Sequence, residues 1–242
     1  MKRITIFLSA IVLLTSAISC KRRTEEGHGK VGVKDYNVTT FSSVDVGAPI
    51  DIDMTVGNVT KPTVSIKGYE NLLGKITCKV ENGVLKIDKD GIFTLYTDKD
   101  IKATITVPSL SALTIRGTSE AKIHGNITGE SFVLNIKGAG DVTIDELNTN
   151  SFVTKVSGAG DLDVKKGAVS KAEFNVTCAG DVDAFGLQIK DLTADLSGAG
   201  DIDVSVSGSL NSSINGAGSV NYRGNPTVSS DINGIGSLEK VD

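Results

Sequence analysis

The chain has 242 residues, of which 39% are hydrophobic and 5% aromatic, with 27 Gly and no Trp. This length allows one long domain or two small ones, and the scarcity of helix signals after residue 20 indicates an extended β protein. The formal net charge is −4, and it becomes −6 (23 basic against 29 acidic residues) once a leader containing Lys2 and Arg3 is removed. That balance argues against nucleic acid or an anionic bilayer surface as the main partner.

Residues 1–19 are predicted to be a lipoprotein signal peptide and to be helical. A basic start precedes Ile4–Leu14, an apolar stretch that is too short to span a membrane. Small residues then precede Cys20, as in the bacterial lipobox, although Ala17 stands where Leu is commonest. We expect Cys20 to become the mature N-terminus and to carry lipid, whose buried acyl chains anchor the protein. The alternative is an ordinary cleaved signal peptide with an incidental Cys.

Residues 20–35 are polar and contain Gly, so a flexible tether is expected there. Residues 36–110 read as a less regular β region, in which Asn82-Gly83 is a strong signal for a two-residue hairpin turn. The apolar alternation predicts strands at 44–56, 62–68, 76–80, 84–88, 92–96 and 101–107. This region is expected to cover or extend the first turn of the repeats that follow.

Residues 111–242 carry a repeat built around a four-residue phrase, which is clearest as Gly-Ala-Gly-Asp. Successive copies begin at steps of 21, 20, 20, 20, 18 and 18 residues. The copies are 117–120, 138–141, 158–161, 178–181, 198–201, 216–219 and 234–237. A period near 20 residues is typical of a solenoid, in which each repeat contacts only its neighbours.

Apolar residues alternate with polar ones on both sides of each phrase, which is the period of a β-strand. Stacking the repeats would place like residues in columns, such as Val142, Leu162, Val182 and Ile202. The predicted fold is therefore all-β: a parallel β-helix or β-solenoid over residues 111–242, preceded by the region 36–110. An alternative is a β-sandwich of hairpins, with the Gly phrases as hairpin turns.

The remaining cysteines and the two histidines give no metal-ligand spacing, and no cofactor is predicted. Cys78 and Cys178 stand at positions typical of small buried residues. An exported protein can form a disulfide, but the sequence does not bring these two residues together. His28 and His124 lie far apart in the chain and are interpreted as ordinary surface residues.

Two late segments and two earlier ones carry a family resemblance. They are Ile214–Ser219 (INGAGS), Ile232–Ser237 (INGIGS), Tyr69–Leu73 (YENLL) and Val107–Leu110 (VPSL). Together with the repeat, they resemble the putative auto-transporter adhesin, head GIN domain family, a former domain of unknown function common in Bacteroidetes lipoproteins. The resemblance covers roughly residues 38–240, so that 36–242 forms one unit. It implies a β-helical, exported, envelope-attached protein with an adhesin label, and it brings no catalytic residues.

The most distinctive chemical feature is a column of carboxylates, Asp141, Asp161, Asp181 and Asp201. One interpretation is a calcium site, because stacked carboxylates can share hard cations. The calcium-binding nonapeptide repeat does not fit, since its period is nine residues. The preferred interpretation is that each Asp accepts a hydrogen bond from a backbone N–H in its own Gly turn. Metal ligation by these four residues is kept as the alternative.

The sequence favours a non-catalytic, adhesin-like lipoprotein of the cell envelope, attached to the outer membrane through Cys20. A glycan or an envelope protein is the expected kind of ligand, with no binding residue assigned and no nucleic acid involved. A polysaccharide-cleaving β-helix enzyme is the alternative, because paired carboxylates can cut glycosidic bonds. However, an active site usually interrupts a repeat with unlike residues, whereas here the Asp residues are themselves the repeat.

Overall fold

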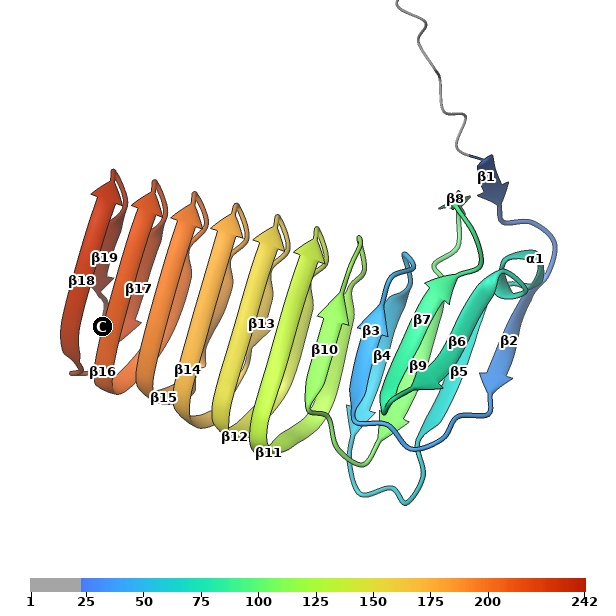
Figure 1. Ribbon diagram of the computed structural model, residues 1–242, viewed down its shortest axis with the longest axis horizontal. Coiled ribbons are helices and arrows are strands. Elements are labelled where there is room, and N and C mark those ends of the chain that lie inside the picture. Colours follow the sequence, from blue (N-terminus) through green and yellow to red (C-terminus); the bar gives the residue numbers. More distant parts are fainter. Residues whose placement is uncertain (1–22) are drawn as a thin grey trace, which may run out of the picture.

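A computed structural model describes residues 23–242 of the chain, apart from the side chain of Cys178 (Figure 1). The predicted signal peptide and Cys20 lie outside the described residues. Within residues 23–242, strands β1 to β19 and one short helix, α1, form an all-β solenoid with a cap at its N-terminal end. No helix in this part of the chain has the length and apolar character needed to cross a membrane.

The repeats stack as parallel strands in register, which confirms the predicted solenoid and excludes the sandwich of hairpins. Val142 pairs with Leu162, and Val182 pairs with Leu162 and Ile202, and all four side chains are at most 1% exposed. The strands of this repeat body are β10 (Ala112–Ile115), β11 (Ala121–Gly138), β12 (Val142–Gly158), β13 (Leu162–Val164), β14 (Gly167–Cys178), β15 (Val182–Gly198), β16 (Ile202–Gly216), β17 (Ser219–Arg223), β18 (Thr227–Gly234) and β19 (Ser237–Lys240).

Each Gly phrase forms a corner where the chain passes from one face of the solenoid to the next. Corners of neighbouring repeats, or rungs, stack in hydrogen-bond contact: the N–H of Ala159 donates to the carbonyl of Gly138 at 2.9 Å. Gly158 has φ +140°, and a Cβ there would lie 2.0 Å from the oxygen of Gly138. The close stacking of corners therefore requires Gly at this position.

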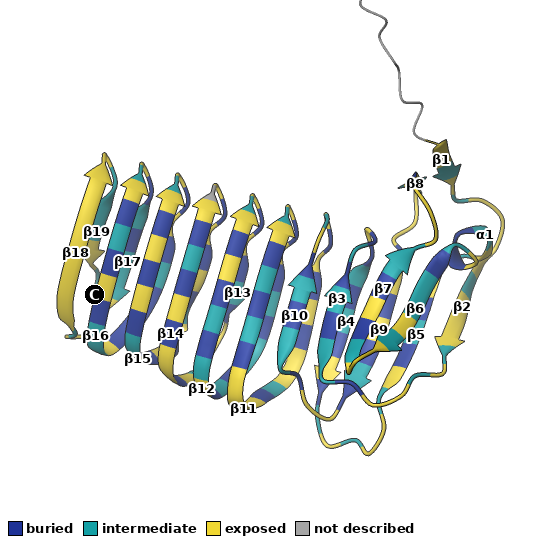
Figure 2. Cartoon of the chain, viewed as in Figure 1, coloured by how far each residue is buried: buried dark blue, intermediate teal, exposed yellow. Residues whose placement is uncertain are grey.

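The interior consists of alternate side chains from both faces, visible as dark bands along the strands in Figure 2. Three phenylalanines pack one after another: the rings of Phe132 and Phe152 are stacked at 5.8 Å, and Phe174 meets Phe152 edge-on at 5.5 Å. In register, Phe152 faces Ala172 while Thr154 faces Phe174. Large and small side chains thus exchange columns between rungs, which keeps the core filled.

The N-terminal cap, residues 23–110, interrupts the parallel pattern with antiparallel pairs. β2 pairs with β5, β5 with β9, and β6 with β7, while β3 and β4 continue the parallel stack onto β10 and β11. Its elements are β1 (Arg23–Glu26), β2 (Val31–Tyr36), β3 (Ser43–Val46), β4 (Asp51–Val56), β5 (Thr63–Tyr69), α1 (Glu70–Leu73), β6 (Ile76–Glu81), β7 (Val84–Lys89), β8 (Phe93–Tyr96) and β9 (Lys102–Val107).

Most predicted strands of the cap are confirmed to within two residues. The hairpin at Asn82-Gly83 is also confirmed: both residues have positive φ, 52° and 76°, and they join antiparallel β6 and β7. The expected strand 44–56 is split into β3 and β4 by residues 47–50. Helix α1 was not expected from the sequence. It buries Leu72 and Leu73 at the cap end of the core, beside β5 and β2.

The expected flexible tether over residues 20–35 is wrong from residue 23 onward. β1 runs parallel to β8, and β2 pairs antiparallel with β5. Tyr36, at the end of β2, packs against the core and donates its hydroxyl to the carbonyl of Ile76 at 3.3 Å. These are edge strands with little apolar burial, so their polar composition resembles that of a linker.

Candidate functional site

The Asp column forms a ladder along one corner of the solenoid. The carboxylate Oδ1 of each Asp accepts the backbone N–H of the residue at the same position in the next rung. These contacts join Asp141 to Asp161 (3.2 Å), Asp161 to Asp181 (3.0 Å), Asp181 to Asp201 (2.8 Å) and Asp201 to Ser219 (2.8 Å). The expected donor in the same Gly turn is therefore wrong. At the corner the N–H points toward the preceding rung, where a short carboxylate takes the place of a strand carbonyl.

A contact of the same kind occurs before the ladder, between the cap and the first copy of the phrase. Oδ1 of Asp51, in β4, accepts the N–H of Glu120 at 3.1 Å. Beside it, the buried hydroxyl of Ser119 accepts the N–H of Ile50 at 3.2 Å. The sequence does contain the signal, because Asp51–Met54 (DIDM) matches Asp201–Val204 (DIDV) at the ladder position.

A shallow hollow of about 370 Å³ runs beside the ladder. Its acidic lining residues are Glu120, Asp141, Asp161, Asp163, Asp181 and Asp183. Lys165 pairs with Asp163, and this contact raises the pKa of the lysine. Among residues 23–242, no group of three or more His, Cys, Asp or Glu side chains is arranged to hold a metal ion. The ladder carboxylates instead serve as acceptors that connect neighbouring rungs.

His124 lies between two carboxylates at the junction of the cap and the repeat body. Its Nδ1 is 2.9 Å from Oδ2 of Asp145, and its Nε2 is 3.5 Å from Oδ1 of Asp53. Lys102 hydrogen-bonds to Asp53 at 2.6 Å, and this contact lowers the pKa of that carboxyl. The group is exposed and joins strands β4, β9, β11 and β12, so it is a surface ion cluster. His28 is exposed and lies elsewhere, in the loop after β1, where its backbone N–H donates to Asn71.

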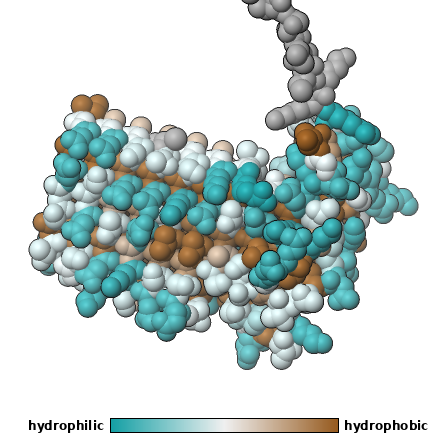
Figure 3. Space-filling view, in the orientation of Figure 1, coloured by the Kyte–Doolittle hydropathy of each residue, from teal (hydrophilic) through white to brown (hydrophobic). Residues whose placement is uncertain are grey.

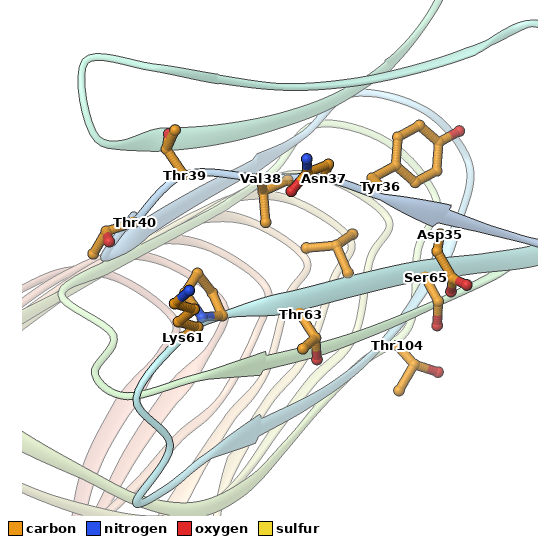
Figure 4. Close-up of a pocket in the computed structure, with 12 residues that line it drawn as sticks. Asp35, Tyr36, Asn37, Val38, Thr39, Thr40, Lys61, Thr63, Ser65 and Thr104 are labelled. Carbon is orange, nitrogen blue, oxygen red and sulfur yellow. The ribbon is translucent and has the colours of Figure 1, made fainter.

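A larger hollow, of about 680 Å³, lies in the cap (Figure 4). The connector after β2, which carries Val38, Thr39 and Thr40, forms one side, and β5 with Thr63 and Ser65 forms the other. The full lining is Asp35, Tyr36, Asn37, Val38, Thr39, Thr40, Lys61, Pro62, Thr63, Val64, Ser65 and Thr104. No pattern in the sequence predicted this cap hollow, because its lining comes from three separate segments.

The lining of the cap hollow offers hydrogen-bonding groups but little acid–base chemistry. It contains one carboxylate, Asp35, and one ammonium group, Lys61, among hydroxyl and amide groups. A glycoside hydrolase needs two carboxyl groups flanking the bond to be cut, so this lining does not meet that requirement. The ring of Tyr36 is covered by the Lys34 ammonium at 4.8 Å from its centroid, and burial raises the pKa of the tyrosine.

Cys78 has a protonated thiol and lies too far from the backbone of Cys178 for a disulfide. Burial raises the pKa of Cys78 to about 11, which keeps the thiol protonated and unreactive. Cys78 is on β6, and the backbone of Cys178 is on β14, with β7, β3, β10, β11 and β12 between them. At about 4.8 Å per strand the two positions are about 29 Å apart, far beyond the ~7 Å reach of a disulfide.

Comparison with known proteins agrees with this architecture. The family described as "Putative auto-transporter adhesin, head GIN domain" matches residues 40–226. A solved structure of a putative adhesin from Bacteroides fragilis is similar to the chain, with 25% identity and a TM-score of 0.82, covering 90% of this chain and 100% of that one. No curated protein sequence matches the chain.

Two further solved structures share the fold. A putative adhesin from Parabacteroides merdae has 19% identity and a TM-score of 0.73, and covers 91% of this chain and 100% of its own. A protein from Parabacteroides distasonis, described as a putative lipid binding protein, has 21% identity and a TM-score of 0.67, with coverage of 91% and 100%. At these identities the likeness concerns the fold alone.

Proposed function

The chain belongs to the putative auto-transporter adhesin, head GIN domain family, and we propose that it is a non-catalytic, adhesin-like binding module of the cell envelope. The observation that carries the proposal is the cap hollow. It lies between antiparallel β5 and the connector after β2, where the repeat is interrupted. Its lining combines hydroxyl, amide, carboxylate and ammonium side chains that do not follow the repeat. Its single carboxylate supports binding rather than glycosidic cleavage.

The lining indicates a polar, hydroxyl-rich ligand such as a glycan. Thr39, Thr40, Thr63, Ser65 and Thr104 offer hydroxyl groups that donate and accept hydrogen bonds. The remaining polar groups add an amide, a carboxylate and an ammonium, while Val38, Val64 and Pro62 provide an apolar floor. A mostly preformed hollow with a few convergent polar groups is the usual form of a small-ligand site.

The protein is further proposed to be a lipoprotein held at the outer membrane through Cys20. The sequence preceding Cys20 supports this proposal, as does the position of β1 at the cap end of the solenoid, three residues after Cys20 (Figure 1). An anchor at Cys20 would hold the cap toward the membrane and leave the last rung, β18 and β19, at the distal end.

A glycan array, followed by calorimetry on any hit, tests the binding proposal. Asn37→Ala and Lys61→Ala, in the hollow, are expected to weaken binding at least roughly tenfold, the effect of losing one good polar contact. The matched controls are Asn211→Ala and Lys137→Ala, equally exposed residues on the repeat body, which should bind normally. Equal loss in the controls, or turnover of the glycan, would contradict the proposal.

Metabolic labelling with a radioactive or clickable fatty acid tests the anchor. Wild-type protein should incorporate the label and sediment with membranes, whereas Cys20→Ala should do neither. Continued labelling or membrane attachment of the Cys20→Ala protein would show that Cys20 is not the anchor. Cys78→Ala serves as the control, because that thiol lies partly buried within β6.

A further inference from the structure

Among the described residues, the two ends of the solenoid differ. At the last rung, β18 exposes positions that belong to the buried core in the preceding rung. All eight residues of β18 are exposed, and within residues 23–242 this strand pairs only with β16. Val228 and Ile232 are 39% and 41% exposed, although Leu210 and Ile214, their partners in the preceding rung, are fully buried. Figure 2 shows β18 uniformly yellow beside the banded strands, and brown atoms mark the same end in Figure 3.

One corner residue adds to this apolar end. The second position of the corner phrase is alanine in the five preceding rungs, namely Ala139, Ala159, Ala179, Ala199 and Ala217. The last rung has Ile235 at this position, and it is 88% exposed. A large apolar side chain therefore replaces alanine only at the rung that has no neighbour among the described residues.

The edge strands β2 and β6 of the cap carry lysines, whereas β18 carries none. β2 exposes Val31 and Val33, but Lys34 and Asp35 follow them, and β6 contains Lys79 and Glu81. Lysines on an edge strand discourage pairing with another chain. β18 contains no Lys, Arg or Pro, and its one charged residue is Asp231.

We propose that β18 is a self-association site, which pairs antiparallel with β18 of a second copy of this chain. The residues of β18 are self-complementary when Ser230 is placed on the two-fold axis. Val228 then faces Ile232 of the second copy on the inner side, and Ser229 faces Asp231 of the second copy on the outer side. Directly opposite residues of an antiparallel pair share one face of the sheet, so this register continues the buried columns across the junction.

Neighbouring registers are less favourable. An axis at Asp231 would place the two carboxylates directly opposite each other, which is destabilising. An axis at Ser229 would pair Val228 with Ser230 and Ile232 with Pro226. Charge and apolar matching therefore both select Ser230 as the centre.

The assembly closes at two copies because the opposite end of the solenoid presents a different surface. α1 and the charged strands β2 and β6 complete the cap, so head-to-tail growth has no matching edge. A surface that pairs with itself about a two-fold axis gives a closed dimer. The two caps then lie at opposite ends of the dimer. If Cys20 is lipidated, as the proposed function requires, molecules on two facing membranes can meet through their last rungs.

Sedimentation velocity on the chain carrying Cys20→Ala tests the dimer without the anchor or a glycan. The chain is expected to show a concentration-dependent monomer–dimer equilibrium, and Ile232→Lys should raise the dimer dissociation constant roughly tenfold or more, because it buries an unpaired charge in the interface. Ile92→Lys is the control: Ile92 is an exposed isoleucine (88%) that lies in the cap, far from β18, so dimerisation should be unchanged. Thermal unfolding of both variants shows whether they fold, and a folded Ile232→Lys monomer supports the proposal.

Disulfide trapping tests the register. Ser230→Cys should form a covalent dimer under mild oxidation, because directly opposite Cα atoms of an antiparallel pair are about 4.5–5.5 Å apart. A mixture of Ser229→Cys and Asp231→Cys chains should form heterodimers more readily than either chain alone forms homodimers. The proposal would be overturned if the chain stayed monomeric at all soluble concentrations or formed species larger than dimers. It would also be overturned if Ile92→Lys raised the dimer dissociation constant as much as Ile232→Lys. None of these outcomes depends on whether the chain binds a glycan or carries lipid.

Discussion

The repeat body and the cap bury the same kinds of side chain, but their strands pair in different ways. In the body, every strand pairs in parallel with a near copy of itself, and the positive-φ corner at Gly158 recurs at Gly138, Gly198, Gly216 and Gly234. In the cap, antiparallel pairs and single contacts join distant segments, as when the Tyr36 hydroxyl donates to the carbonyl of Ile76 at 3.3 Å. The body is therefore a sum of similar neighbour contacts, whereas the cap depends on contacts made once. The larger hollow lies in the cap, where the repetition stops.

The two regions are expected to differ most in the free energy of unfolding that is lost when a glycine is replaced by alanine. Gly158→Ala in the body should lower the free energy of unfolding by about 4 kcal/mol, because its Cβ would collide with the Gly138 carbonyl at a backbone position that cannot move freely. Gly74→Ala in the cap should change it by less than ~0.5 kcal/mol, since Gly74 has helical φ and open space around it. Urea denaturation measures both. A similar loss in the two variants would contradict the distinction.

The cap should be most sensitive where α1 closes the core. Leu72 is fully buried, so Leu72→Ala should cost about 3 kcal/mol through lost burial and the cavity left behind. Ile92→Ala, at an exposed cap residue, should stay within ~0.5 kcal/mol of wild type. Hydrogen exchange should show lost protection in β2, β5 and α1 before β15 and β16. Uniform loss along the whole solenoid would show that cap and body unfold as one unit.

One position in the body is expected to gain stability. The hydroxyl of Thr154 is buried and has no hydrogen-bond partner among the described residues. Thr154→Val keeps the shape and removes the unpaired polar group, so it should raise the free energy of unfolding by about 1.5 kcal/mol. Thr143→Val, at a partly exposed body position, is the control and should be close to neutral. A loss of stability in Thr154→Val would indicate that the hydroxyl has a partner in solution.

Substitutions in the Asp ladder test whether these carboxylates serve as hydrogen-bond acceptors or as ligands of a cation. Asp161→Ala removes the acceptor for the Asp181 N–H and should cost about 1 kcal/mol. Asp161→Asn keeps the Oδ1 acceptor and should cost less. Neither loss should depend on calcium, and millimolar calcium should leave the melting temperature unchanged. A rise in melting temperature with calcium that disappears in Asp161→Asn would identify a bound cation, because a ligand of the folded state stabilises it.

The smallest expected effect lies at the junction of the two regions. Hydrogen bonding to Lys102 lowers the pKa of Asp53, so the folded state holds this carboxyl more firmly ionised than the unfolded state does. The resulting stability is present above the ordinary aspartate pKa, about 4, and is lost as the pH falls through the lowered value. The stability difference between wild type and Lys102→Met should therefore shrink below pH ~4. Exposure of the pair keeps the effect small, and a difference that grows in acid would contradict it.

Sequence alone determined the features that repeat. The period near 20 residues and the alternation around each corner predict parallel stacking, the Val142 to Ile202 column and the glycine corners. These follow because each rung meets its neighbour at a fixed spacing, so a local pattern repeated in the chain becomes a column in space. The hairpin at Asn82-Gly83 does not repeat, but it was predictable because two adjacent residues are enough to specify the turn.

Tertiary structure decided what does not repeat. The donors to the Asp ladder lie in the next rung, Phe174 and Ala172 exchange columns, and residues 23–36 form edge strands instead of a tether. The cap hollow brings together Asp35, Lys61 and Thr104, which no pattern in the chain connects. Each of these depends on which segments meet after folding and how side-chain volumes fit together. Such contacts are made once, between residues far apart in the chain, and therefore leave no periodic signal in the sequence.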